Sequence, residues 1–243
     1  FGRWAGLFAA AALAVSFWNL MFARLAERPI SLPGMALVTV LVYAHLLEHK
    51  PHALLPYAGA GLLLGLTLYT YPAALIFPVV LGAWIGLRAL SGELGLRAVW
   101  LRLALSVALA GLLAIPLVLA WNDPAATSRA NEVSMPLQAL WGGDPGPVLA
   151  NVLPVLGMFS VAGDHGLEFN VQDQPVFPTI PLAMLFYVGV AWSGAALFSR
   201  KGRRNPGYGL LVLWLLLMLV PTLVTDRPVN PYRTIGLLGV VYF

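Results

Sequence analysis

The sequence predicts an all-α protein, a polytopic bundle of transmembrane helices. The chain has 243 residues, of which 60% are hydrophobic and only 10% are charged, and its mean hydropathy is +0.83. A soluble domain carries roughly a quarter charged residues, because its surface must be hydrated. Long uncharged runs alternate here with short charged loops, which indicates lipid as the solvent.

About seven spans are expected, because a helix of about 20 apolar residues crosses about 30 Å of hydrocarbon. The chain then forms one transmembrane domain over 1–243, and an eighth span begins after Arg233. Since the last apolar run stops short, we expect the chain to be an internal fragment of a longer protein. Five uncharged runs have sufficient length: 5–23, 29–47, 103–121, 180–198 and 206–225.

The uncharged stretch 53–87 predicts two short spans, 53–69 and 72–87. One continuous helix would be about 50 Å long at 1.5 Å per residue, which is too long for a bilayer. Pro72 also disfavours a helical conformation of Tyr71. We therefore expect a hairpin with its turn at 69–72.

The distribution of positive charge supports this hairpin. With two spans in 53–87, nine of the 14 Lys and Arg residues share one side, which the positive-inside rule makes cytoplasmic. A single span there would reverse the bias. The nine are Arg3, Lys50, Arg88, Arg97, Arg102, Arg200, Lys201, Arg203 and Arg204, and the other five are Arg24, Arg28, Arg129, Arg227 and Arg233.

This topology assigns the long segment 122–179 to the extracytoplasmic side of a plasma membrane. The segment is rich in Gly, Pro, Asp and Asn. A loop of such length usually has its own structure and often carries function. The same side holds most of the acidic residues, so we look for function there.

Two outside arginines are candidate phosphate ligands. Arg24 follows the first span beside Glu27 and Arg28, and Arg233 lies in the turn after 225. A guanidinium offers forked donors that match phosphate oxygens. The alternatives stay open: Arg24 is equally an interfacial anchor, and acids near Arg233 can balance its charge.

Other motifs are weaker. Asp164 and His165 form a polar turn, for which turn chemistry is favoured over catalysis. Gly61 and Gly65 form a small-xxx-small pattern, which predicts close helix packing. No metal ligand set is expected within the chain, and the absence of cysteine excludes thiolate sites. Since no ionisable residue lies near the middle of a span, an ion pump is disfavoured.

Several segments in order resemble bacterial membrane glycosyltransferases of the GT-C fold, in the family 39 or protein mannosyltransferase-like group. These segments are FWNLMFAR at 17–24, AGLLLGLTLYTYP at 60–72, GMF at 157–159 followed by Gly163, Asp164 and Asn170, and DRPVNPYRTIG at 226–236.

The resemblance implies transfer of a sugar from a polyprenyl-phosphate donor to an acceptor protein, lipid or glycan on the extracytoplasmic face. In this family an acidic residue of the first outside loop acts as the general base or metal ligand, which leaves a divalent metal ion open as a cofactor. That acid is expected upstream of Phe1, so we expect the fragment to be inactive alone. Arg24 and Arg233 are then candidates for the donor phosphate, and Asp164 and Tyr71 for the sugar or acceptor.

Two other classes remain open. A transporter or flippase subunit for a lipid-linked or amphipathic substrate would use the same arginines without cleaving a bond. A non-catalytic membrane assembly protein would lack both the upstream acid and lipid-phosphate binding.

Overall fold

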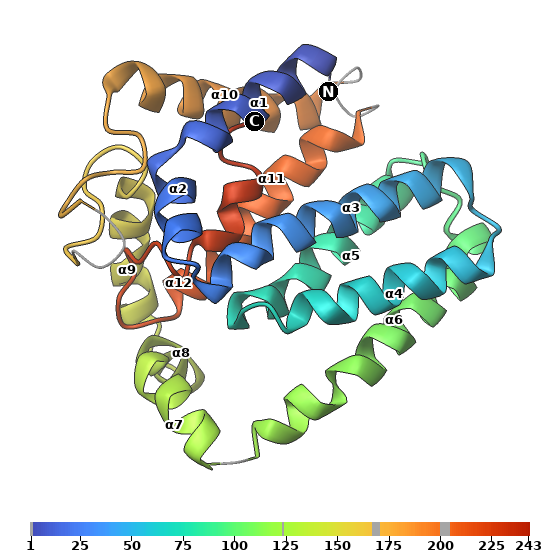
Figure 1. Ribbon diagram of the computed structural model, residues 1–243, viewed down its shortest axis with the longest axis horizontal. Helices are drawn as coiled ribbons and strands as arrows, with labels where there is room; N and C mark the ends of the chain where they lie inside the picture. The colour runs from blue at the N-terminus through green and yellow to red at the C-terminus, as the bar shows by residue number, and fades with distance from the viewer. Residues whose placement is uncertain (1, 123, 167–170, 200–204) are drawn as a thin grey trace.

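The protein is all-α (Figure 1). The computed structural model describes residues 2–122, 124–166, 171–199 and 205–243, and within them there are helices, turns and loops but no strand. Two sequence features lie outside these residues: Asn170 and the basic cluster at 200–204. The predicted fold class is confirmed at this level.

Five described helices are long and apolar enough to cross a membrane. They overlap four of the five long runs predicted from the sequence and the second half of the predicted hairpin. In chain order these helices are α3 (Ser31–His49) with its leading turn η1 (Arg28–Ile30), α5 (Phe77–Leu90) with η2 (Pro72–Ile76), α6 (Leu96–Ala120), α10 (Ile180–Phe198), and α11 (Pro206–Met218) with α12 (Val220–Leu223).

The predicted span 5–23 is broken in the structure. It forms α1 (Arg3–Val15) and α2 (Phe17–Arg24), which meet at 54° and add a sixth candidate if counted together. Ser16 between them leaves the helical conformation, and its hydroxyl accepts the Asn19 N–H at 3.2 Å. A serine in this position caps a new helix, so the chain restarts with a changed direction.

The stretch 53–87 folds as two helices, as predicted. The first, α4 (Leu54–Leu68), ends before Tyr69, and η2 begins at Pro72. Tyr71 is extended, with φ −163° and ψ 151°, because a following proline excludes the helical conformation. At 15 residues, α4 is about 22 Å long, so its role as a span stays a prediction.

Close packing of α4 on α6 confirms the interpretation of the small-xxx-small pattern. A Cβ at Gly61 would lie 2.3 Å from the Ser106 carbonyl oxygen, so only glycine permits this approach. The Ser106 hydroxyl donates to the Tyr57 carbonyl at 2.8 Å and shares a 2.5 Å hydrogen bond with the Tyr43 hydroxyl. Ser106 thereby joins α3, α4 and α6.

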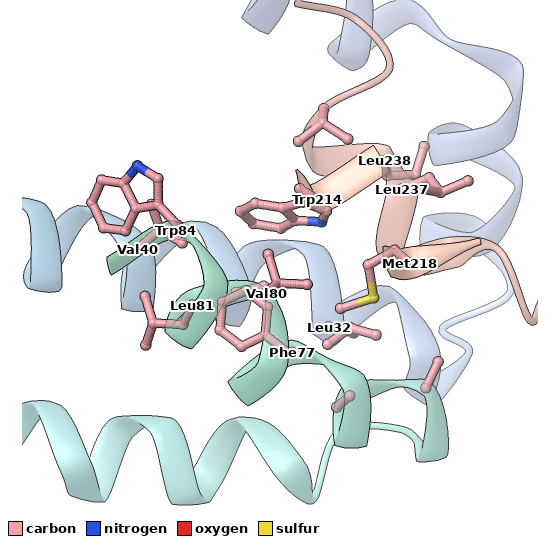
Figure 2. Packing of buried hydrophobic residues seen from close by; sticks show 14 of the residues in the cluster. Leu32, Val40, Phe77, Val80, Leu81, Trp84, Trp214, Met218, Leu237 and Leu238 are labelled. Carbon is pink, nitrogen blue, oxygen red and sulfur yellow. The ribbon is translucent and has the colours of Figure 1, made fainter. Parts of the chain in front are cut away.

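The main core lies where α3, α5 and α11 meet the C-terminal segment (Figure 2). Residues after Arg233 do not begin a long helix as expected: they form the short 3₁₀ helix η4 (Ile235–Gly239), all of it buried. Gly236 permits this, because a Cβ there would lie 2.9 Å from the Met218 sulfur. The side chains at the centre of the cluster include Leu32, Val40, Phe77, Val80, Leu81, Trp84, Trp214, Met218, Leu237 and Leu238.

Polar contacts join loops at each of the two ends of the bundle. At one end the buried Arg88 pairs with Glu48 at 3.8 Å and with Glu93 at 3.6 Å. At the other end the Asp226 N–H donates to the Val133 carbonyl at 2.9 Å. Which end faces the cytoplasm stays a prediction.

The segment 122–179 is not a simple loop. It contains α7 (Pro124–Val133), α8 (Met135–Trp141) and α9 (Gly146–Gly157), followed by irregular chain up to α10. In Figure 1 α9 lies beside α2 and α12, and α8 and α7 lie below it. This segment supplies walls for the cavities described below.

A Gly61→Ala substitution should destabilise the protein, whereas Gly59→Ala on the same helix should not. The added methyl at 61 meets backbone that cannot move aside, and nothing lies within 4 Å of a Cβ at 59. Overpacking of this kind costs about 1–3 kcal/mol, while alanine is otherwise the better helix former. Thermal unfolding in detergent measures the difference, and equal midpoints for the two variants would contradict the packing argument.

Candidate functional site

The segment 224–234 brings distant parts of the chain together around Tyr232. The Tyr232 hydroxyl donates a hydrogen bond to the Glu27 carboxylate. Its ring makes edge-to-face contacts with Phe22 at 5.4 Å and with Tyr71 at 5.6 Å between centroids. The end of α2 and the α4–η2 turn therefore meet at this residue.

Local turn chemistry positions Tyr232 and Arg233. The Asn230 side-chain oxygen accepts the Tyr232 N–H at 2.9 Å, and the Thr234 hydroxyl donates to the Asn230 carbonyl at 3.1 Å. An asparagine that bonds to backbone two residues ahead forms an Asx-turn, which fixes the residues that follow. Tyr232 and Arg233 thus project from a constrained turn.

Arg233 forms an ion pair within the same segment. Its Nη1 lies 2.9 Å from Oδ1 of Asp226 and donates to the Arg227 carbonyl at 3.1 Å. The side chain is 15% exposed. A nearby acid therefore balances this charge, which is the structural alternative to a ligand. Both contacts use Nη1, and a guanidinium carries further N–H donors on Nε and Nη2.

Tyr71 belongs to the same cluster, but Arg24 stands apart. Arg24 is exposed on the last turn of α2, where a cation complements the helix dipole. Among the hydrogen bonds, ion pairs and ring contacts of the described residues, none joins Arg24 to Arg233, Tyr71 or Asp164. This exposed position near Glu27 agrees with the alternative role of Arg24 as an interfacial anchor.

Asp164 lies in a tight turn, which agrees with the prediction that Asp164 and His165 form a polar turn. Its Oδ1 accepts the Gly166 N–H at 3.1 Å, and its carbonyl accepts the Asp173 N–H at 2.9 Å. The Asp173 carbonyl in turn accepts the Gly163 N–H at 2.9 Å, and its carboxylate pairs with Nδ1 of His165. The turn is therefore closed on itself by Asp173.

Two adjoining cavities share this turn. The first, about 290 Å³, lies beside the α1–α2 break and is mostly apolar, with Asp164 as its one ionisable acid among the described residues. The second, about 570 Å³, is bordered by α9 and by charged groups of both loops. Gly163, Asp164 and Val229 line both cavities. The ionisable side chains of the second are Asp164, His165, Asp226 and Arg227.

One wall of the first cavity carries an unsatisfied donor. Trp18 is only 6% exposed, and its indole N–H has no hydrogen-bond partner among the described residues. A buried donor without a partner is costly. Trp18 is therefore a polar group of this wall that sequence reasoning missed.

Sequence reasoning also missed the Glu27–Tyr232 bond. In the sequence Glu27 lies near two arginines, whereas its partner Tyr232 lies 205 residues away. Tyr232 lies in the segment DRPVNPYRTIG at 226–236, which resembles the glycosyltransferase family. That resemblance is the sequence signal that could have identified Tyr232 as a site residue. Nothing in residue spacing predicts that the two meet.

The family resemblance leaves a divalent metal ion open as a cofactor. Within the described residues, no three His, Asp or Glu side chains converge as metal ligands.

Comparison with known proteins finds no matching family model, no matching curated protein and no matching solved structure. The site must therefore be interpreted from its own residues.

The environment of Tyr232 changes its acidity. Removal from water, and then the hydrogen bond and negative charge of Glu27, raise the pKa of Tyr232 to about 12 from 10.0. Because the pKa of this acid is higher in the folded state, the contribution to stability is full below pH 10. It is lost as the pH rises from 10 towards 12.

Replacing Glu27 with Gln should lower the pKa of Tyr232 towards 10.0, since the carboxylate charge is removed. Tyrosinate absorbance measured against a Tyr232→Phe background isolates this one ionisation from those of the other tyrosines. An unchanged titration midpoint in the Glu27→Gln protein would show that the bond does not control the phenol.

Proposed function

We propose that the chain is part of a membrane glycosyltransferase. It would transfer a sugar from a polyprenyl-phosphate donor to an acceptor at the extracytoplasmic face of the plasma membrane. The observation that supports this is the pair of adjoining cavities, one mostly apolar and one with charged walls, that share Asp164. Such a pair suits a donor with a lipid part and a polar part.

The proposal includes the topology. Seven spans cross the membrane, with α4 as a shortened one and the bent α1–α2 pair as another. The segment 122–179 then lies outside with the 224–234 segment, to which α7 and α9 are bonded through Val133 and Asn151. Residues of both segments line the two cavities.

The chemistry is an inverting displacement at the anomeric carbon. The acceptor hydroxyl oxygen forms the new bond while the bond from that carbon to the phosphate oxygen breaks. The departing lipid phosphate keeps the electron pair, and the hydroxyl proton goes to a base. The base is not assigned to a residue of this chain, and the residues proposed here bind the substrates and stabilise charge.

Arg233 is the proposed partner of the departing phosphate. Asp226 lines the second cavity and holds the Arg233 guanidinium at 2.9 Å, although Arg233 itself lines neither of the two cavities. A fixed cation stabilises charge that develops as the bond breaks, without reorganisation at that moment. Arg24, which lies apart from Arg233 on the exposed end of α2, is proposed only as a second cation that a lipid phosphate can meet there.

Tyr71 and Asp164 complete the proposed site. The Tyr71 ring packs on Tyr232, and aromatic faces are suited to line a sugar. The Asp164 carboxylate lies at the boundary between the cavities, where a sugar or acceptor hydroxyl can donate to it. Its bond to Gly166 holds one oxygen in place.

Arg233→Ala in the full-length enzyme should lower turnover of a polyprenyl-phosphate-linked sugar by about 10²–10³-fold, the cost of losing one donor to a developing charge. Release of polyprenyl phosphate from radiolabelled donors loaded with a hexose or a pentose measures it. Arg97→Ala, an exposed residue at the opposite end of the bundle, is the control.

Unchanged donor turnover in the Arg233→Ala enzyme, with normal thermal stability, would refute the assignment. The Asp226→Asn variant separates charge from position, because it keeps the guanidinium but weakens the group that orients it. Its turnover should fall between those of the wild type and Arg233→Ala.

Asp164→Asn should weaken acceptor or donor binding by about tenfold to a hundredfold, since a hydrogen bond to a charged group contributes roughly 1.5–3 kcal/mol. The amide oxygen can still accept the Gly166 N–H, so the turn should persist. Steady-state KM values for both substrates test this. A normal KM for each would leave Asp164 as a turn residue only.

The transporter alternative has a distinct outcome in the same assay. A flippase would move the labelled lipid between leaflets of a vesicle without releasing polyprenyl phosphate from its sugar. Movement without cleavage would therefore replace the transferase proposal.

A further inference from the structure

The α8–α9 hairpin carries a large exposed apolar surface that the proposed reaction does not use. On α9, Leu149, Leu153 and Leu156 are 64%, 79% and 51% exposed. Their spacing of four and three residues places them on one face of the helix. Met135 and Trp141 on α8, which packs against α9, are 61% and 78% exposed.

The opposite face of α9 is attached to the bundle. The Asn151 amide nitrogen donates to the Leu223 carbonyl at 2.8 Å and to the Thr225 carbonyl at 2.9 Å. Val155, one turn further on the same face, is 1% exposed. These contacts fix the rotation of α9 about its axis. Its leucine face therefore points away from the bundle.

The same bonds place α9 at the level of the bilayer boundary. Leu223 is the last residue of the apolar helix Pro206–Leu223, which is long enough to cross a membrane. A helix joined to that end lies where the hydrocarbon gives way to headgroups. At 12 residues, α9 is about 18 Å long, too short to cross about 30 Å of hydrocarbon itself.

The composition of the hairpin fits lipid better than a soluble partner. Between 135 and 161, Asp144 in the connecting turn is the one ionisable residue. Protein interfaces carry a polar rim, which this surface lacks. An exposed tryptophan beside a leucine face is typical of helices that lie in the membrane interface.

We propose that the α8–α9 hairpin lies within the membrane interface, in the leaflet next to the 224–234 segment, with Leu149, Leu153 and Leu156 in contact with lipid. The occupant of this surface is bilayer lipid, independently of the reaction catalysed. Because Leu153 and Pro154 also border the second cavity, one wall of that cavity is then a helix bathed in lipid.

Spin labels can test this directly, because these 243 residues contain no cysteine. Single-cysteine variants Leu149→Cys, Leu153→Cys and Leu156→Cys of the full chain are labelled and reconstituted in phosphatidylcholine–phosphatidylglycerol vesicles. Collisions with oxygen report lipid, and collisions with a water-soluble nickel chelate report water. Leu185→Cys, 69% exposed on α10, is the lipid reference, and Glu132→Cys, exposed on α7, is the water reference.

At the three α9 positions we expect an oxygen-to-nickel collision ratio close to that of the lipid reference at 185 and well above that of the water reference at 132. A ratio equal to the Glu132 value would overturn the proposal, since the face would then lie in water. Labels that are immobile and collide with neither reagent would overturn it in favour of a protein partner. If the unlabelled full chain released no polyprenyl phosphate while the α9 labels gave the expected ratio, only the proposed function would be refuted.

Discussion

The hydrogen bond from Trp214 to the Gly236 carbonyl, 2.8 Å long and fully buried, is the contact on which the candidate site depends. A short 3₁₀ helix in an apolar core leaves backbone groups that need partners, and Trp214 satisfies one of them from α11. At the other end of the segment, the Thr222 hydroxyl donates to the Pro228 carbonyl. These two hydrogen bonds, at Pro228 and at Gly236, fix the segment 226–234 to α11 and α12. The fixed segment holds Tyr232 and Arg233 near α2 and the α4–η2 turn.

At the opposite end of the bundle, a buried arginine and two glutamates connect the helices. Arg88 is 7% exposed, lies over the Trp84 ring at 5.3 Å and pairs with two glutamates, yet its Nε and Nη1 have no hydrogen-bond partner among the described residues. A buried ion pair is weak evidence for stability, because desolvation can exceed the attraction. Its effect is to determine which helices meet, since Glu48 belongs to α3 and Glu93 to the α5–α6 connection. One end is thus joined by charge, and the other by aromatic contacts and backbone hydrogen bonds.

Local chemistry explains what could be predicted from the sequence. Pro72 predicted the turn after α4, because a proline restricts the residue before it. Gly61 with Gly65 predicted close helix packing, but the pattern did not identify α6 as the partner. The break at Ser16 lies in an uncharged run that hydropathy treats as continuous, so only a capping argument could have found it. The burial of η4 and the Glu27–Tyr232 bond require tertiary packing, which no periodicity encodes. The cavities likewise arise from loops that meet only in the folded chain, so Asp164 was predicted as a turn and not as their shared wall.

The separation of 205 residues between Glu27 and Tyr232 has a consequence for biogenesis. During synthesis, α3 to α6 can pair with neighbours as each emerges, because their contacts are close in sequence. The bond to Glu27 and the packing of η4 against α3 must wait for nearly all of these residues to be made, and long-range contacts of this kind form slowly. In the interval, the apolar side chains of α3 that η4 will pack against are exposed to the translocation machinery or to lipid. The candidate site is therefore the last part of this chain to assemble, and membrane insertion of the early helices precedes it as a separate step.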